Sequence, residues 1–311
     1  MQQRWCAREA MIMNRPNAKI LVDGGGPQDT QRIKELLGFV DGQTTNPTLI
    51  SKNPHIRQLI AAGHKLSKKE ELDEYRRIVQ TISPLVGQVG VSIEVFCDQN
   101  TTARGMLDQG REMFSWIANA YIKYPCTAEG LRAAKVSVGE GIRINMTLCF
   151  SQRQAAAIYV ATKGTKEPVY VSPFVGRLDD IKQNSIDLVR NIKRMFSNSD
   201  RHVLVLAASI RSLEHLLYCF LLETELATVP AKILERWASR DFPCPTHTSS
   251  TELPASPFPM RSWTWGERGI RLTSNTSLPA KASKNSWLII AQLFLAPRDY
   301  NTIFRTIALL G

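Results

Sequence analysis

The chain has 311 residues, of which 43% are hydrophobic and 22% charged, a composition that is ordinary for one large globular domain. No apolar run reaches the roughly 20 residues that a membrane-spanning helix needs, so a membrane protein is not expected. The net charge of +11 comes from lysines and arginines mixed with acids, as in LSKKEELDEYRR, and the lack of a basic run argues against nucleic-acid binding.

Strand-like and helix-like segments alternate from Ala18 to about Ser239. The expected strands are 18–23, 39–43, 90–95, 119–123, 142–147, 168–172, 202–209 and 226–229. The helical patterns are 30–37, 48–62, 68–84, 101–117, 128–138, 151–163, 179–196, 212–222 and 231–238. Asp29 is expected to cap the first helix and Thr127 the helix at 128–138.

Eight strands, each followed by helical sequence, indicate a parallel sheet covered by helices on its outer face. Eight is also the number at which such a sheet closes, so the predicted fold is a single-domain α/β (β/α)8 TIM barrel. An open doubly wound sheet is the alternative. The GGGP segment after Asp23 lacks the GxGxxG spacing that a dinucleotide-binding sheet of that kind usually carries.

Three regions are expected along the chain. Residues 1–16 form an N-terminal extension that we expect to be disordered, and residues 17–239 form the barrel. Residues 240–311 are predicted to be an irregular tail, because FPCPTHTSSTELPASPFP is rich in Pro, Ser and Thr and nearly uncharged.

Polar side chains occupy the carboxyl ends of the predicted strands, where TIM barrels carry their chemistry. Burying a charged group such as Lys123 or Glu94 is costly without a partner, so a shared site explains these positions better than separate structural roles. A lysine facing the barrel interior can supply a neutral amine that attacks a carbonyl. The strand-end residues are Asp23, Asn46, Glu94, Lys123, Thr147, Ser172 and Ser209.

Six motifs carry a resemblance to a known family. DGQTTNPTLI (41–50) and YIKYPCTAEGLRA (121–133) resemble the two signatures of the transaldolase family, and the second contains the lysine that forms the Schiff base. VSIEV (91–95), INMTLCF (144–150), VSPFVGRLDD (171–180) and AASIRSLEH (207–215) also stand as they do in that family. The resemblance covers about residues 18–239.

The resemblance implies a mechanism. Lys123 attacks the ketone of fructose 6-phosphate or sedoheptulose 7-phosphate, Glu94 and Thr147 hold a catalytic water, and Asp23 takes the proton of the C4 hydroxyl. A dihydroxyacetone unit then passes to an aldose phosphate, as in the pentose phosphate pathway. The implied substrate-binding residues are Thr45, Asn46, Asn145, Ser172, Phe174, Arg177, Ser209 and Arg211. No metal or organic cofactor is expected, because the lysine itself is the electron sink.

Several readings stay open. The chain could stop at aldol cleavage, as fructose-6-phosphate aldolases of the wider family do, although they tend to carry a tyrosine where this chain has Phe174. It could also be a catalytically impaired barrel that only binds sugar phosphates. The six cysteines lack CxxC spacing and indicate free thiols in a reducing cytoplasm. Whether the chain forms a homo-oligomer is left open.

The tail departs from the acidic segment that relatives carry after the barrel. When MRSWTWGER (260–268) is back-translated with plausible codons and shifted by one base, it reads YEELDLGRE, which resembles that segment. We therefore hypothesise that the reading frame shifts after about Phe242. Sequencing of the transcript tests this hypothesis, and one intact frame that encodes the tail as given would refute it.

Overall fold

The computed structural model describes residues 15–63, 66–180 and 185–244, together with the backbone of 263–266 and 269–272. Eight parallel strands close into a barrel in sequence order, with β8 paired to β1. The barrel strands are β1 (Lys19–Asp23), β2 (Gly42–Thr44), β3 (Gly90–Glu94), β4 (Ala120–Pro125), β5 (Ile144–Cys149), β6 (Val169–Pro173), β7 (Val203–Ala207) and β8 (Leu226–Val229). The predicted (β/α)8 barrel is confirmed.

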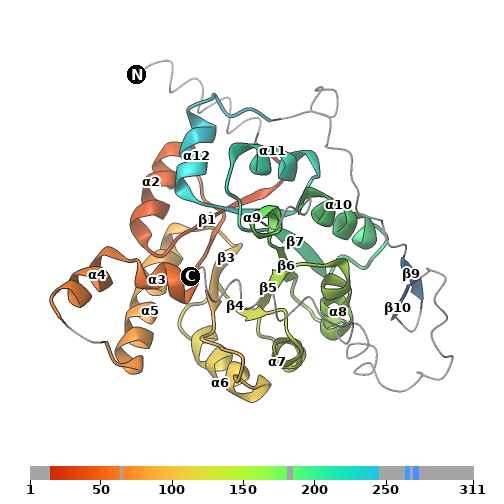
Figure 1. Ribbon diagram of the computed structural model, residues 1–311, viewed down its shortest axis with the longest axis horizontal. Helices are drawn as coiled ribbons and strands as arrows, with labels where there is room; N and C mark the ends of the chain where they lie inside the picture. Colours follow the sequence, from red (N-terminus) through yellow and green to blue (C-terminus); the bar gives the residue numbers. More distant parts are fainter. Residues whose placement is uncertain (1–14, 64–65, 181–184, 245–262, 267–268, 273–311) are drawn as a thin grey trace.

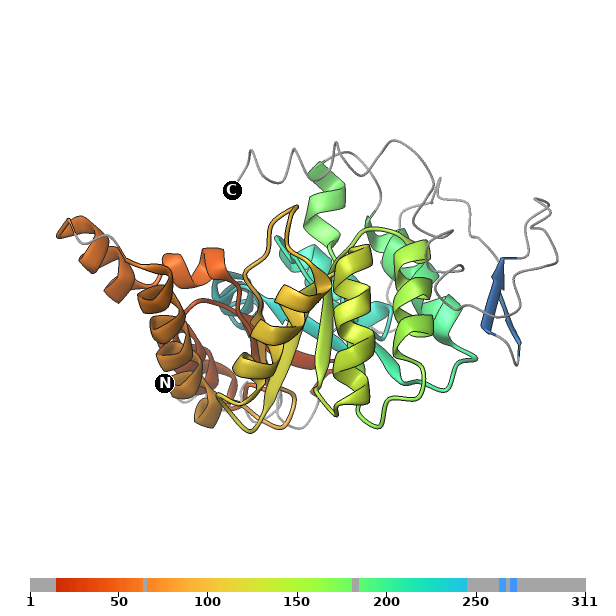
Figure 2. The same cartoon turned by 90° about the horizontal axis from the view of Figure 1, so that it is seen from below.

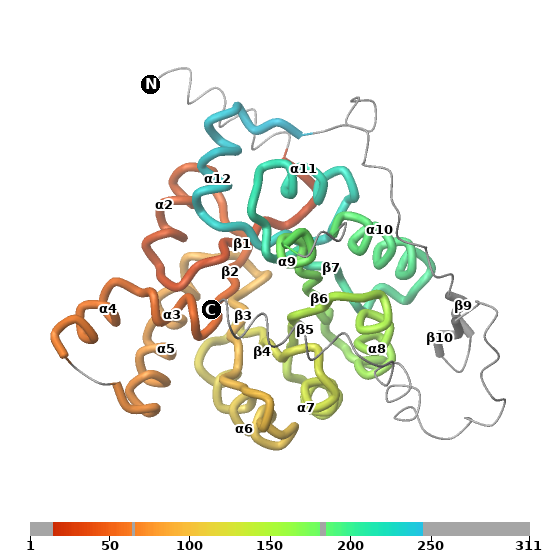
Figure 3. The backbone as a smooth tube through the Cα atoms, in the orientation of Figure 1, coloured from red at the N-terminus to blue at the C-terminus, as the bar shows by residue number. Residues whose placement is uncertain are grey.

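Helices surround the barrel (Figure 1), and the chain passes from strand to helix in sequence order around it (Figure 3). The helices are α2 (Pro27–Leu37), α3 (Pro47–Ser51), α4 (Pro54–Ala61), α5 (Lys68–Ile82), the 3-10 helix η1 (Ser83–Leu85), α6 (Ala103–Phe114), α7 (Ala128–Gly139), α8 (Gln152–Thr162), α9 (Val175–Asp180), α10 (Ser185–Phe196), α11 (Leu213–Leu221) and α12 (Ala231–Ala238). Seen from below, α4 projects from the side of the barrel, in orange in Figure 2. No helix within the described ranges is long and apolar enough to cross a membrane.

Local sequence signals explain most helix starts. The Ser67 hydroxyl accepts a hydrogen bond from the Glu70 amide, and the Glu70 carboxylate accepts one from the Ser67 amide, which forms a capping box at α5. Thr127 caps α7 as predicted, because its hydroxyl accepts a hydrogen bond from the Gly130 amide.

The predicted start of the first helix was wrong. Helix α2 begins at Pro27, two residues before Asp29, and its N-cap is the extended Gly26. Proline has no amide hydrogen and its fixed φ suits the first helical position, which explains the earlier start. Asp29 lies in the first turn instead, where a negative charge is favourable.

The segment between β1 and α5 also differs from the prediction. Strand β2 begins at Gly42 rather than at residue 39, and the Asp41 carboxylate before it accepts a hydrogen bond from the Ile20 amide at 2.7 Å. The single helix predicted over 48–62 is split into α3 and α4 at Asn53. The residue before a proline is disfavoured in a helix, and Asn53 caps α4 by accepting a hydrogen bond from the His55 amide.

The predicted boundary at residue 239 lies within packed structure. Phe242 packs edge-on against Trp237 with a centroid distance of 5.3 Å, and the Trp237 indole donates a hydrogen bond to the Pro243 carbonyl at 3.0 Å. Farther along, β9 (Trp263–Gly266) and β10 (Gly269–Leu272) form a two-stranded antiparallel sheet. The expected disorder of 1–16 falls almost entirely outside the described residues.

The barrel interior is layered. Tyr121 and Tyr170 stack at 4.2 Å between ring centroids, within a cluster that also contains Leu21, Leu206 and Leu226. Successive inward-facing residues of a strand are two apart, so the next inward residues of four of these strands are Lys123, Ser172, Asp23 and Thr228. An apolar floor therefore lies directly beneath a polar layer at the carboxyl ends of the strands.

Two glycines with left-handed backbone differ in how closely other backbone atoms approach them. Gly90 and Gly141 both have left-handed φ, at 79° and 76°, but a Cβ on Gly90 would lie 2.1 Å from the Asn119 carbonyl oxygen, whereas Gly141 has open space. We expect Gly141→Ala to lower the free energy of unfolding by about 1 kcal/mol and Gly90→Ala by about 3 kcal/mol, measured by denaturant unfolding. Equal losses would show that the Asn119 backbone moves aside freely.

Candidate active site

Lys123 lies in the fully buried strand β4, and its side chain is 7% exposed. Its Nζ is 3.0 Å from Oε2 of Glu94, which stands opposite it on β3. The same Nζ donates a hydrogen bond to the Thr45 carbonyl oxygen at 3.4 Å. A buried amino group needs such partners, because an unpaired charge in this position would be strongly destabilising.

Strand β5 supplies two polar side chains beside the lysine. Asn145, opposite Lys123 in the register, donates to the Ser92 hydroxyl at 3.1 Å and accepts from the Ser172 hydroxyl at 2.7 Å. The Thr147 hydroxyl is buried and has no hydrogen-bond partner among the described residues. Buried polar atoms are nearly always satisfied, so the Thr147 hydroxyl marks a place where water or a ligand atom belongs.

Asp23 ends strand β1 at the same mouth. Its carboxylate accepts a hydrogen bond from the Thr44 hydroxyl at 2.9 Å, and Thr44 lies 2.5 Å from the Thr228 hydroxyl. Because Thr44 has one hydroxyl hydrogen, Thr228 is the donor in that second contact. Burial raises the pKa of Asp23, and the charge of Lys123 and the Thr44 hydrogen bond oppose this rise. A carboxyl in this setting can take up a proton and return it.

Two arginines lie at the outer edge of the mouth. Arg211 forms an ion pair with Asp180, and Arg177 lies 3.8 Å from the other oxygen of that carboxylate. The hydrogen bond from Arg211 and the charges of both arginines lower the pKa of Asp180. Gly176 permits this arrangement, since a Cβ there would come within 2.6 Å of the Arg211 side chain. Two guanidinium groups that share one carboxylate can also bind a phosphate.

Backbone strain occurs on both sides of this mouth. Leu148, which follows Thr147, and Ser209, which follows β7, both have φ of 59°. The Ser209 carbonyl accepts a hydrogen bond from the Gly176 amide at 3.0 Å. Left-handed backbone at a residue other than glycine is costly and is often found at functional sites.

Three other predicted site residues, Asn46, Thr45 and Phe174, make contacts within the protein. The Asn46 side chain caps α3 by accepting from the Leu49 amide. The Thr45 hydroxyl is 2.7 Å from the Tyr75 hydroxyl and donates to the Ser92 carbonyl, so Thr45 turns its carbonyl and not its side chain to Lys123. Phe174 packs edge-on against Phe150 at 5.7 Å between centroids.

Sequence reasoning missed Thr44, Ser92 and Tyr75. The period of two in a strand could have identified the first two, because Ser92 lies two residues before Glu94 and Thr44 is opposite Ser92 in the register. No sequence signal marked Tyr75, which lies on helix α5.

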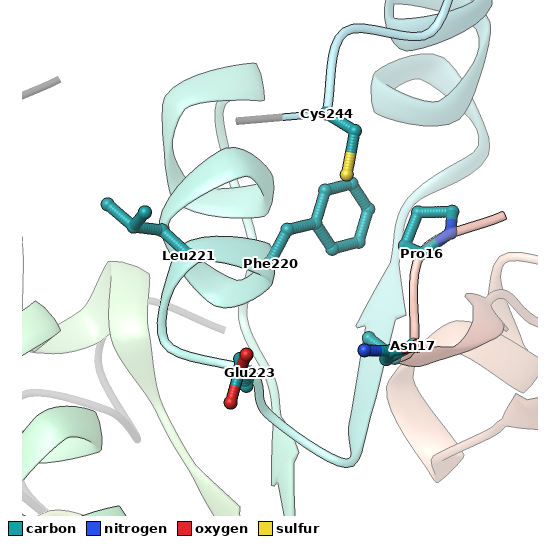
Figure 4. Close-up of a pocket in the computed structure, with 7 residues that line it drawn as sticks. Pro16, Asn17, Phe220, Leu221, Glu223 and Cys244 are labelled. Carbon is teal, nitrogen blue, oxygen red and sulfur yellow. The ribbon is translucent and has the colours of Figure 1, made fainter. Parts of the chain in front are cut away.

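Other features do not belong to this site. A pocket lined by Pro16, Phe220, Glu223 and Cys244 (Figure 4) lies at the amino ends of β1 and β8, away from Lys123. Its volume of about 120 Å³ is below the roughly 300–1,000 Å³ usual for ligand sites. Within the described part of the chain, no group of three or more His, Cys, Asp or Glu side chains could hold a metal ion.

Comparisons with known proteins identify the family of this chain. Residues 20–257 match the family model described as transaldolase/fructose-6-phosphate aldolase. A probable transaldolase of Agathobacter rectalis is 37% identical over 218 residues, which is 70% of this chain and 88% of the relative. A probable transaldolase of Lactiplantibacillus plantarum is 35% identical, over 69% of this chain and 86% of its own. One of Thermoplasma volcanium is 37% identical, over 67% and 84%.

Asp23→Asn is expected to raise Tm at pH 7. Because the folded state raises the pKa of this carboxyl, the folded chain binds its proton more tightly, and stability falls as pH rises from about 3.9 through the raised folded value. The asparagine variant avoids this cost, so the difference in Tm should disappear below about pH 4.

Asp41→Asn is the matched control. The Asp41 carboxylate accepts hydrogen bonds from Arg15 and from the Ile20 amide, so its loss should lower Tm at pH 7. A lower Tm for Asp23→Asn at pH 7 would contradict the assignment of Asp23 as a carboxylate buried at a cost.

Proposed function

Because this chain belongs to the transaldolase/fructose-6-phosphate aldolase family, we propose that it is a transaldolase that acts through a Schiff base on Lys123. The proposed reaction moves a dihydroxyacetone unit from fructose 6-phosphate or sedoheptulose 7-phosphate to an aldose phosphate. One observation carries the proposal: the buried Lys123 amino group lies 3.0 Å from the Glu94 carboxylate, and the buried Thr147 hydroxyl of the neighbouring strand has no hydrogen-bond partner among the described residues.

The first step is formation of the Schiff base. Glu94 accepts a proton from the Lys123 ammonium, and the neutral amine attacks the C2 carbonyl of the ketose to give a carbinolamine. The C2 hydroxyl must then leave as water, which requires a proton at that oxygen. A water held by the Thr147 hydroxyl and Glu94 carries this proton from Glu94 to the leaving oxygen, so Glu94 acts first as base and then as acid, and Thr147 holds the water in place.

The second step breaks the C3–C4 bond. Asp23 takes the proton of the C4 hydroxyl, C4 becomes an aldehyde, and the electron pair of the broken bond moves to the iminium nitrogen on Lys123. The first aldose phosphate leaves, and an enamine of dihydroxyacetone remains. Asp23 now holds a proton, which the raised pKa of this carboxyl favours.

The third step reverses the sequence with a new acceptor. The enamine carbon attacks the aldehyde of the second aldose phosphate, and the aldehyde oxygen takes the proton back from Asp23. Water then hydrolyses the iminium and releases the new ketose phosphate. Asn145 and Ser172, already hydrogen-bonded to each other, are suited to bind sugar hydroxyls, and Asn46 and Ser209 lie at the same strand ends.

In this proposal, the two arginines explain why the substrate is phosphorylated. Phe174 explains why transfer is favoured over cleavage. A phosphate carries more charge than the Asp180 carboxylate, so it can displace Asp180 from Arg177 and Arg211. Phe174 has no hydroxyl to direct a water onto the enamine, which favours transfer over release of free dihydroxyacetone. Aldol cleavage alone is the second candidate.

Four further expectations remain part of this proposal. The barrel is proposed as the catalytic unit, and a frame shift after about Phe242 remains a hypothesis, although the matched family segment continues to residue 257. A role in the pentose phosphate pathway would follow from the reaction. A cytoplasmic location is supported by the described cysteines, which are all free.

Borohydride trapping with fructose 6-phosphate tests the Schiff base. We expect a reduced dihydroxyacetone adduct on Lys123, located by peptide mass spectrometry, and its complete loss in Lys123→Ala. Lys34→Ala is the matched control, because Lys34 is a partly buried lysine that hydrogen-bonds the Leu85 carbonyl outside the site; this variant should keep the adduct. A folded wild-type protein without an adduct would reject the proposal.

Addition of erythrose 4-phosphate to the same protein separates the two candidate reactions. Without borohydride, a transaldolase passes the dihydroxyacetone unit of the unreduced enamine to erythrose 4-phosphate and forms sedoheptulose 7-phosphate, whereas an aldolase releases dihydroxyacetone at a rate that does not depend on the acceptor. We expect transfer.

A further inference from the structure

Tyr75 of helix α5 points from outside the barrel toward the active site. Tyr75 is completely buried and packs edge-on against Phe96 and Trp116, with ring centroids 6.0 and 5.9 Å away. Its hydroxyl lies 3.0 Å from the Glu94 amide nitrogen and 2.7 Å from the Thr45 hydroxyl. The tyrosine therefore joins the ends of β2 and β3.

The direction of these hydrogen bonds is determined by their two ends. The Glu94 amide can only donate, so the Tyr75 hydroxyl accepts from it. The Ser92 carbonyl can only accept, so the Thr45 hydroxyl donates its one hydrogen there, at 2.8 Å. Tyr75 must then donate to Thr45. This chain of bonds requires a protonated phenol, and burial raises the pKa of Tyr75 accordingly.

Among the described residues, the two that Tyr75 holds are the two that contact the Lys123 amino group. Glu94 offers its carboxylate at 3.0 Å and Thr45 its carbonyl oxygen at 3.4 Å. Each contact depends on the local backbone, because Thr45 uses its own carbonyl and the Glu94 side chain starts from the residue whose amide Tyr75 binds. We propose that Tyr75 is a positioning residue that sets the geometry of Glu94 and Thr45 around Lys123, an inference that rests on the proposed Schiff-base function.

A second buried tyrosine provides a matched control. Tyr124 is also completely buried, and its hydroxyl lies 3.0 Å from the Ser137 hydroxyl of α7. It joins a strand to a helix as Tyr75 does, but its partner has no contact with Lys123 among the described residues. Tyr75→Phe and Tyr124→Phe therefore each remove one buried hydroxyl, and only the first disturbs the surroundings of the lysine.

The test measures the rate of imine formation separately from phosphate binding and from bond cleavage. Dihydroxyacetone and borohydride label a Schiff-base lysine without phosphate binding or bond cleavage, and the rate at Lys123 is read by peptide mass spectrometry. We expect Tyr75→Phe to slow labelling at least tenfold, because carbinolamine dehydration needs Glu94 in place. Tyr124→Phe should label within about twofold of wild type while losing a similar amount of Tm.

The Glu94→Gln background shows whether Tyr75 acts through Glu94. If it does, adding Tyr75→Phe to Glu94→Gln should slow labelling by much less than tenfold. An equal effect of Tyr75→Phe in both backgrounds, or labelling as fast as in Tyr124→Phe, would overturn the inference.

The outcomes for the proposed function are separate. If wild-type Lys123 is labelled but sugar-phosphate transfer is absent, transaldolase activity fails and the labelling rates still decide the role of Tyr75. If transfer occurs and Tyr75→Phe labels normally, the inference alone fails. A wild-type protein without any label on Lys123 would overturn both.

Discussion

The burial of one amino group explains much of the design of the barrel mouth. Lys123 is almost inaccessible to solvent, so the protein must replace the water that the amine loses. It does so with the Glu94 carboxylate, the Thr45 carbonyl and, through electrostatic attraction, with Asp23. The surrounding residues hold these partners in place, Thr44 for Asp23 and Tyr75 for the other two. The result is a buried amino group whose neighbours are determined by strand register and helix packing.

The overall fold could be predicted because its dominant signal is periodic. Apolar strands that alternate with helices repeat eight times, and β8 and α12 have the bounds that the pattern indicated. Several errors lie between β1 and α5, where short-range effects compete with hydrophobic periodicity, and another lies after β6, where α9 begins at Val175, ahead of the helix predicted over 179–196. Pro27 moves one helix start, and the Asn53–Pro54 pair divides another helix. In both cases a proline determined the boundary, and the pattern of apolar residues did not contain that information.

The carboxyl ends of the strands predicted the core of the candidate site, but not the residues that surround it. Closure of a parallel barrel brings strand ends together, so Asp23, Glu94, Lys123 and Thr147 meet even though they are far apart in sequence. Strand-end positions carry no information about residues on the helices that surround the barrel. Tyr75 is an ordinary apolar-face residue of α5 by its spacing, and only the three-dimensional contact of its hydroxyl reveals a second role.

The apolar floor beneath the polar layer has a consequence for solvent. Tyr121, Tyr170 and the three leucines close the barrel below Lys123, so the polar layer opens toward the carboxyl ends of the strands. In the proposed reaction, sugar, water and protons would all reach Lys123 from that side. A sugar phosphate bound there would obstruct the path of bulk water to the proposed covalent intermediate. Protection against premature hydrolysis would then come from the acceptor molecule itself, and the lifetime of the intermediate would depend on how fully that side is occupied.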